Sequence, residues 1–194
     1  MSLEEIFQDI EANFRKLPGK TAFYYKNLVS GATFSLNASA PIIAASVIKL
    51  PIMAEFFFQA AEGKIDTNTE YAVQVQDKLP SCGALNYLHD GVRVTLMDLC
   101  TLMIILSDNT ATNLLIRRLG MDAINQRIRA LGLKNTRLNR LLFDADAQKQ
   151  GLENRVSAKD MGLLLSLLYE GKLVSTQASK QMLDTLKNQR LNGK

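Results

Sequence analysis

The 194-residue sequence contains no tryptophan, one histidine, two cysteines and four prolines. Two cysteines, Cys82 and Cys100, are too few for a disulfide scaffold, and we expect both to be reduced, half-buried thiols. With His89 as the single histidine, a zinc site of four Cys and His ligands is excluded. No Gly-x-Ser-x-Gly motif presents a serine to His89. We therefore expect neither a metal nor a cofactor.

Long hydrophobic runs are absent as well. The longest nearly uncharged stretch, residues 27–48, is interrupted by Gly31 and Pro41, so no membrane span is expected. The first five residues lack the basic and apolar regions of a signal peptide. The composition, 47% hydrophobic and 22% charged, is that of a globular protein with one substantial core or two small lobes.

The net charge of +4 is mildly basic. Between residues 117 and 140, seven cations accompany one acid, Asp122: Arg117, Arg118, Arg127, Arg129, Lys134, Arg137 and Arg140. This cluster has two interpretations, a nucleic-acid surface or a solvated face of two helices. The second is favoured because no aromatic residue interleaves the cluster and no known motif frames it. We expect no nucleic-acid partner.

The hydrophobic pattern predicts an amphipathic helix over 4–16, a β-hairpin of 21–28 with 32–36, and helices only from Pro41 onward. The expected helices lie at 45–62, 99–106, 109–119, 121–131, 161–170 and from 175 or 176 to about 189, with a loop over 134–155. We assign residues 1–39 to the helix and hairpin of an α/β domain, 40–190 to a helical domain and 191–194 to a tail. A lone hairpin is marginally stable, so the sheet is expected to be incomplete.

The first candidate for chemistry is Ser46-Val47-Ile48-Lys49, at the start of an apolar helix. Positions i and i+3 share a helix face, so the hydroxyl and the amine can meet. A buried lysine loses proton affinity and can accept the serine proton, which activates the nucleophile. The alternative is a helix start whose lysine reaches out to solvent.

The second candidate is Ser107-Asp108-Asn109, directly after an apolar segment. This triplet is rarer by chance than Ser-x-x-Lys. The alternative is an ordinary helix junction, because Ser, Asp and Asn are common N-caps. That alternative explains the residue types but not their pairing with the first motif.

Together, Ser46-x-x-Lys49 and Ser107-Asp108-Asn109 resemble the class A serine β-lactamases and related penicillin-recognising serine hydrolases. The resemblance covers most of the chain and implies an α/β (α+β) fold of the serine β-lactamase/DD-peptidase type. It implies that Ser46 is the acylated nucleophile, Lys49 its proton acceptor and Ser107 a proton relay.

By the same resemblance, Asn109 binds the substrate's side-chain amide. Asp108 braces the loop structurally, and Arg140 anchors the family's omega loop.

Two departures from the family pattern stand out. No glutamate follows Arg140 before Glu153, so Asp144 or Asp146 is the candidate base for deacylation, with solvent exposure of both aspartates as the alternative. No Lys-Thr-Gly triplet is present either, and we interpret the chain as a fragment that ends before the C-terminal sheet segment. The hairpin should then present an unpaired edge and an uncovered apolar face, which invites self-association.

The implied function is β-lactamase-like hydrolysis of the β-lactam ring, a reaction that confers antibiotic resistance. The alternatives are a penicillin-binding D-alanyl-D-alanine peptidase-type enzyme and a catalytically impaired binding protein. The implied partner is a small β-lactam or D-alanyl peptide. The resemblance implies a periplasmic or secreted location, and the missing signal pattern leaves a cytoplasmic one open.

Overall fold

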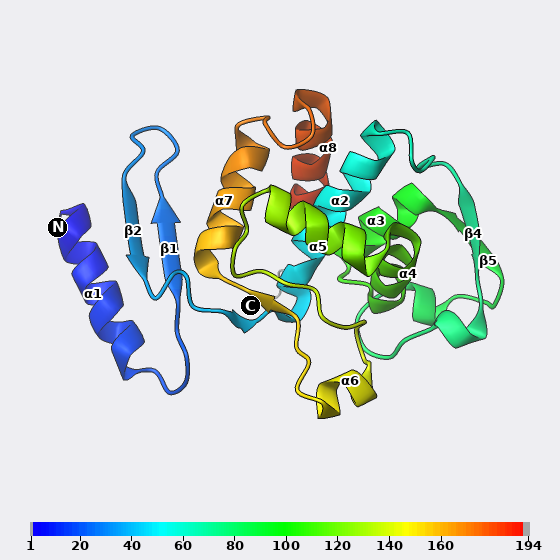
Figure 1. The fold of residues 1–194 in the computed structure, drawn as a ribbon, viewed down its shortest axis with the longest axis horizontal. Coiled ribbons are helices and arrows are strands. Elements are labelled where there is room, and N and C mark those ends of the chain that lie inside the picture. Colours follow the sequence, from blue (N-terminus) through cyan, green and yellow to red (C-terminus); the bar gives the residue numbers. More distant parts are fainter. Residues whose placement is uncertain (1, 192–194) are drawn as a thin grey trace.

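The structure, a computed structural model, describes residues 2–191. The last three residues of the expected tail lie outside this range. A helix and a hairpin form one end of the molecule, and a larger, mostly helical body forms the rest (Figure 1). Among the described residues, no helix is both long enough and apolar enough to cross a bilayer.

The N-terminal unit consists of α1 (Leu3–Lys16), β1 (Phe23–Lys26) and β2 (Thr33–Leu36), with β1 and β2 antiparallel. A capping box of Ser2 and Glu5 starts α1. The helix and the hairpin predicted from the sequence are both confirmed. Phe7 of α1 stacks on Phe34 with ring centroids 4.1 Å apart. The helix therefore covers one face of the hairpin.

The opposite face of the hairpin lies against α7 (Ala158–Tyr169). A Cβ atom on Gly162 of α7 would lie 2.3 Å from the ring of Tyr24, so only glycine allows this approach. The expectation of an uncovered apolar face was therefore wrong, because α1 and α7 cover the two faces. Within residues 2–191, β1 pairs only with β2 and its other edge carries no strand.

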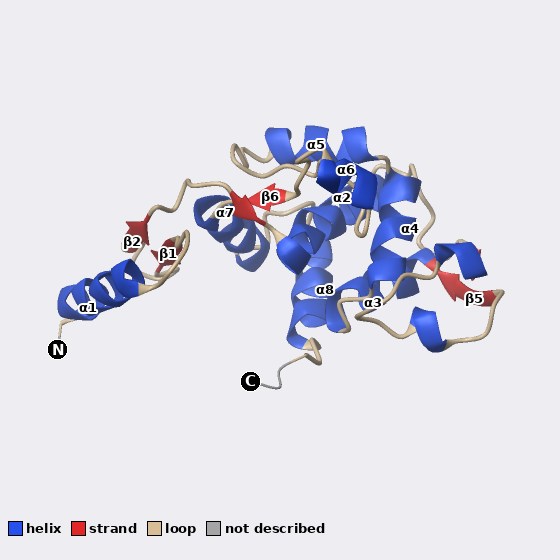
Figure 2. Cartoon of the chain, turned by 90° about the horizontal axis from the view of Figure 1, so that it is seen from below, coloured by secondary structure: helices blue, strands red, loops and turns tan. Residues whose placement is uncertain are grey.

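The helical body is built around α2 (Lys49–Ala61), which contacts α3, α4 and α5. Its core side chains, such as Ile52 and Phe56, are fully buried, as the apolar sequence predicts. The surrounding helices are α3 (Leu96–Ile105), α4 (Asn109–Leu119), α5 (Met121–Ala130) and α8 (Thr176–Lys187). Figure 2 shows the same arrangement from below.

The prediction of helices only after Pro41 was wrong. Two short antiparallel pairs occur there: β3 (Ile42–Ile43) with β6 (Arg155–Val156), and β4 (Glu70–Val73) with β5 (Val92–Thr95). Strands of two to four residues show too little alternation to be recognised from sequence. Helix α6 (Ala145–Lys149) interrupts the expected loop, and short 3₁₀ turns lie at η1 (Ala45–Ile48), η2 (Val75–Asp77) and η3 (Leu85–Tyr87).

Candidate active site

The two sequence motifs meet in space. Ser46 lies on η1 and Ser107 lies between α3 and α4, and their hydroxyl oxygens are 2.8 Å apart. Lys49, the first residue of α2, places Nζ 3.3 Å from Ser46 Oγ and 2.8 Å from Ser107 Oγ. The three side chains form a connected cluster of hydrogen bonds, which we call the Ser46 cluster.

Lys49 is 2% exposed, so its amine does not reach solvent. Nζ also lies 2.7 Å from the carbonyl oxygen of Ser107 and 3.1 Å from Asn109 Oδ1. Burial lowers the pKa of Lys49 to about 8, against a smaller opposing effect of Cys82 and Asp108. The neutral amine that a general base requires is therefore a minor form near neutral pH, but far more populated than in an exposed lysine.

Two of the residues with a left-handed backbone lie at or beside these serines. Ser107 has a φ of 53°, and Ala45, the neighbour of Ser46, has a φ of 43°. Side-chain-bearing residues rarely adopt this left-handed region, and such strain persists only where the surroundings enforce it. The hydrogen bonds from Lys49 to the Ser107 carbonyl and hydroxyl are part of that enforcement.

Asp108 fixes the loop beside the site. Its carboxylate caps α4 through the backbone N–H of Ala111 and also accepts hydrogen bonds from the N–H groups of Ala84 and Leu85. A Cβ on Gly83, whose φ is +125°, would lie 2.3 Å from this carboxylate. The bracing role that the resemblance implied for Asp108 agrees with these contacts.

A cleft of about 370 Å³ opens on Ser46. We group its lining by position in the chain and call the groups its two walls: the first includes Ala45, Ser46, Ser81, Cys82 and Asn109, and the second includes Arg140, Leu142, Phe143 and Glu153. Asn109 is 7% exposed and also donates to the carbonyl of Pro80 at 3.4 Å.

Both cysteines are free, but the expectation that both are half-buried was wrong, because Cys82 is exposed on this cleft and Cys100 is buried in the core. Burial raises the pKa of the Cys100 thiol far above its usual range.

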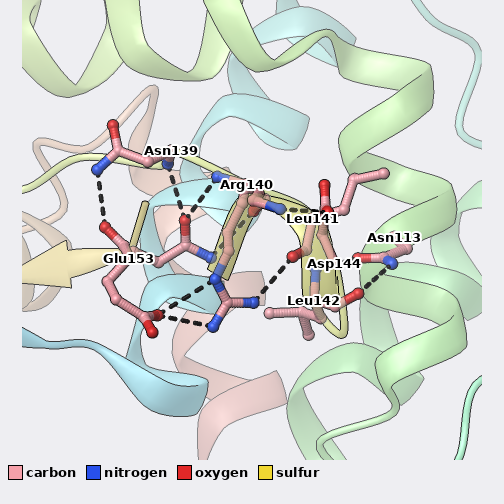
Figure 3. A network of polar contacts seen from close by, with 9 residues as sticks. Asn113, Asn139, Arg140, Leu141, Leu142, Asp144 and Glu153 are labelled. Atoms are coloured by element: carbon pink, nitrogen blue, oxygen red, sulfur yellow. Dashed lines mark hydrogen bonds and ion pairs between the residues drawn. The ribbon is translucent and has the colours of Figure 1, made fainter. Parts of the chain in front are cut away.

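The second wall is held by an ion pair and an asparagine (Figure 3). Arg140 donates to Glu153 Oε2 from Nε at 3.2 Å and from Nη2 at 2.7 Å. This pairing lowers the pKa of Glu153 below its ordinary value. Asn113 holds the backbone of Leu142 through two hydrogen bonds, from Leu142 N at 2.9 Å and to Leu142 O at 3.0 Å.

The structure does not bring Asp144 into this cleft. Its Oδ1 accepts a hydrogen bond from the N–H of Ala147 at 2.9 Å and caps α6. The apolar side chain of Leu142 lines the cleft instead, and the carboxylate there, Glu153, is paired with Arg140.

Sequence reasoning missed Leu142, Glu153 and Asn113. For Asn113 a signal existed, because it lies one helical turn after Asn109 on the same face of α4. Leu142 and Glu153 carried no comparable signal, because they lie in irregular stretches on either side of α6.

The fold and the Ser46 cluster define a protein of the class that contains serine β-lactamases and penicillin-binding proteins. Residues 2–193 match the model of the β-lactamase enzyme family. The chain belongs to this family.

Its relatives include the β-lactamase CARB-3 of Pseudomonas aeruginosa, 24% identical over 98% of this chain and 66% of the relative. The β-lactamase ROB-1 of Haemophilus influenzae is 27% identical over 91% of this chain and 58% of the relative. The chain thus spans about two thirds, or less, of the length of these curated relatives.

Among solved structures, a β-lactamase from Sphaerobacter thermophilus is 31% identical with a TM-score of 0.88. PBP-A is 30% identical with a TM-score of 0.87. Each comparison covers 98% of this chain and 71% of the other.

Proposed function

We propose that Ser46 is acylated by β-lactams and that the protein is a β-lactamase-type serine hydrolase. The observation that carries the proposal is the buried Lys49 amine, within hydrogen-bond distance of both Ser46 and Ser107. A serine hydroxyl is a weak nucleophile until an adjacent base accepts its proton, and this amine is placed to do so.

In the proposed reaction, Ser46 Oγ attacks the carbonyl carbon of the β-lactam amide while its proton passes to Lys49. The carbon–nitrogen bond of the ring then breaks, and the ring nitrogen receives a proton through Ser107. Water completes the cycle by hydrolysing the Ser46 ester and restoring the hydroxyl. Asn109, which lines the cleft, is proposed to bind the substrate's side-chain amide.

A β-lactam substrate is supported by the relatives named as β-lactamases. It is supported also by PBP-A, because a mutant of that protein is described as an acyl-enzyme complex with penicillin G. By family resemblance we propose a periplasmic or secreted location. We also propose a capacity for self-association, because the second edge of β1 carries no strand within the described residues.

A second candidate function is a penicillin-binding enzyme of the D-alanyl-D-alanine peptidase type, in which the acyl-enzyme persists. It is favoured by Leu142, an apolar side chain in the cleft, and by Glu153, whose carboxylate is engaged by Arg140. A paired carboxylate is a poor acceptor for the proton of a water molecule. Asp144 as the deacylation base remains a prediction.

The proposal is tested by incubating the protein with benzylpenicillin and following its intact mass with time. We expect an adduct with the full mass of the penicillin on Ser46, absent in Ser46→Ala and retained in Ser81→Ala, a serine of the same cleft. Rapid loss of the adduct with release of hydrolysed penicillin supports the hydrolase, and a persistent adduct supports the second candidate. The absence of any adduct, or one that survives Ser46→Ala, would overturn both.

A further inference from the structure

A second surface of the molecule concentrates positive charge away from the Ser46 cluster. Two hollows of about 310 Å³ each adjoin there and share Lys134 and Asn135. We call their combined lining the basic groove, defined by its cations: Lys26, Arg129, Lys134, Arg137, Arg155 and Lys159.

Most cations of the basic groove have no acid paired with them within the described residues, although Arg155 lies close enough to Glu153 to contribute to the lowered pKa of that carboxyl. Lys26 lies 3.5 Å from Glu170, but the side chains of the other five cations make neither an ion pair nor a hydrogen bond within residues 2–191. The carboxylate that lines the groove, Asp160, accepts hydrogen bonds from the N–H of Asn135 and the hydroxyl of Thr136. It therefore contributes to the fold rather than to pairing the lysines.

The structure divides the cation cluster that was recognised in the sequence. Arg117, Arg127 and Arg140 pair with acids, Arg117 with Asp77, Arg127 with Glu55 and Glu62, and Arg140 with Glu153. Arg129, Lys134 and Arg137 instead line the groove, together with Arg155 and Lys159 from later in the chain. A face that only contacts solvent does not require five unpaired cations around two adjoining hollows.

Within the basic groove, Arg137 and Arg155 lie directly opposite each other. They form an isolated antiparallel bridge, with N–H to carbonyl distances of 2.8 and 3.0 Å in the two directions. Side chains directly opposite each other in such a pair leave on the same face, and like charges placed there are destabilising. A bound anion would relieve this repulsion.

We propose that the basic groove binds a linear polyanion of repeating phosphate groups. Two hollows that share Lys134 both carry cations, and together they offer more charge than a single phosphate would engage, which suits a chain of anionic groups. The hollow lined by Arg137 and Arg155 contains no aromatic side chain, and Tyr24 in the other has its ring against Gly162. Nucleic-acid bases commonly stack on aromatic rings, so a phosphate polymer without bases fits the groove better.

The test is a calorimetric titration of the protein with inorganic polyphosphate, repeated at several salt concentrations. The double variant Arg137→Gln/Arg155→Gln should lower the affinity about tenfold and make the dependence of log affinity on log salt shallower by about two. The matched control, Lys16→Gln/Arg118→Gln, removes two exposed cations outside the groove and should change the affinity less than about twofold. Lys134→Gln/Lys159→Gln provides a second groove variant.

The midpoint of thermal unfolding shows that each variant is folded. Because Arg137→Gln/Arg155→Gln removes a repulsive pair, its midpoint should not fall. Equal losses in groove and control variants would reduce the effect to overall charge, and a wild-type protein that does not bind polyphosphate would also overturn the proposal. Tighter binding of oligothymidylate with the same number of phosphates would identify a nucleic-acid surface instead.

Discussion

The two walls of the cleft differ in the catalytic groups that they present: the first has a complete set for acylation, and the second lacks a free base. On the wall of Ser46, each polar group of the cluster has partners, and the base is buried and held by four contacts of Lys49 Nζ. On the wall of Arg140, the backbone is held as firmly, but an apolar side chain and a paired carboxylate face the space. Acylation and water activation are thus separable properties of one cleft, and the structure supports the first more strongly than the second.

The largest effect is expected from Lys49→Ala. Removing the proton acceptor should slow acylation of Ser46 by penicillin about 10³-fold, within the range of a positioned general base. Stopped-flow fluorescence with a fluorescent penicillin measures the rate, and Lys64→Ala, an exposed lysine, is the control. An unchanged rate in Lys49→Ala would show that Lys49 is not the base for acylation.

A large loss of stability is expected from Asp108→Ala. The change leaves the backbone N–H groups of Ala84, Leu85 and Ala111 without their acceptor and should lower the free energy of unfolding by about 3 kcal/mol. Urea denaturation measures this value. Asp108→Asn, which keeps one side-chain oxygen, should lose less, and a loss equal to that of alanine would contradict the assigned contacts.

The second wall is tested by Leu142→Glu. A carboxylate at this position would enter the cleft from a backbone that Asn113 already holds, and could accept a proton from water. We expect the lifetime of the Ser46 adduct to shorten about tenfold. Leu152→Glu, on an exposed part of the same segment, is the control, and equal lifetimes in both variants would show that the second wall does not limit deacylation.

The smallest effect is expected from blocking Cys82. Because this thiol is exposed on the cleft and Cys100 is buried, a maleimide should react with Cys82 alone. Its bulk should slow acylation at least about threefold by displacing the bound substrate. Cys82→Ser protein should be insensitive to the reagent, and a slowed rate in that variant would point to another site of reaction.

The Ser46 cluster could be recognised from sequence because its chemistry is encoded locally. Ser46 and Lys49 lie within one helical turn, the apolar surroundings of Lys49 predict its burial, and Ser107 follows an apolar helix at a sharp junction. The distance between Ser46 and Ser107 was not encoded in that way. It followed only from the family resemblance, and the structure places the two hydroxyls 2.8 Å apart.

The second wall and the basic groove were less predictable for a physical reason. Both depend on residues that are distant in the chain and lie in segments without regular periodicity. Arg137 and Arg155 became neighbours through one isolated bridge. The sequence likewise does not explain Gly162 within α7, whereas its close contact with the Tyr24 ring in the folded protein does. Contacts of this kind depend on tertiary packing and leave no trace in local composition.

The pH dependence of single-turnover acylation tests the central claim most directly. The neutral Lys49 amine is the active form, so the rate should rise with pH and level off, with a midpoint near the Lys49 pKa of about 8. The reaction of benzylpenicillin with excess protein, quenched and read by intact mass, provides the rate at each pH. A midpoint near about 10.4, the value of a solvent-exposed lysine, or a rate independent of pH would contradict the assignment of Lys49 as the buried base.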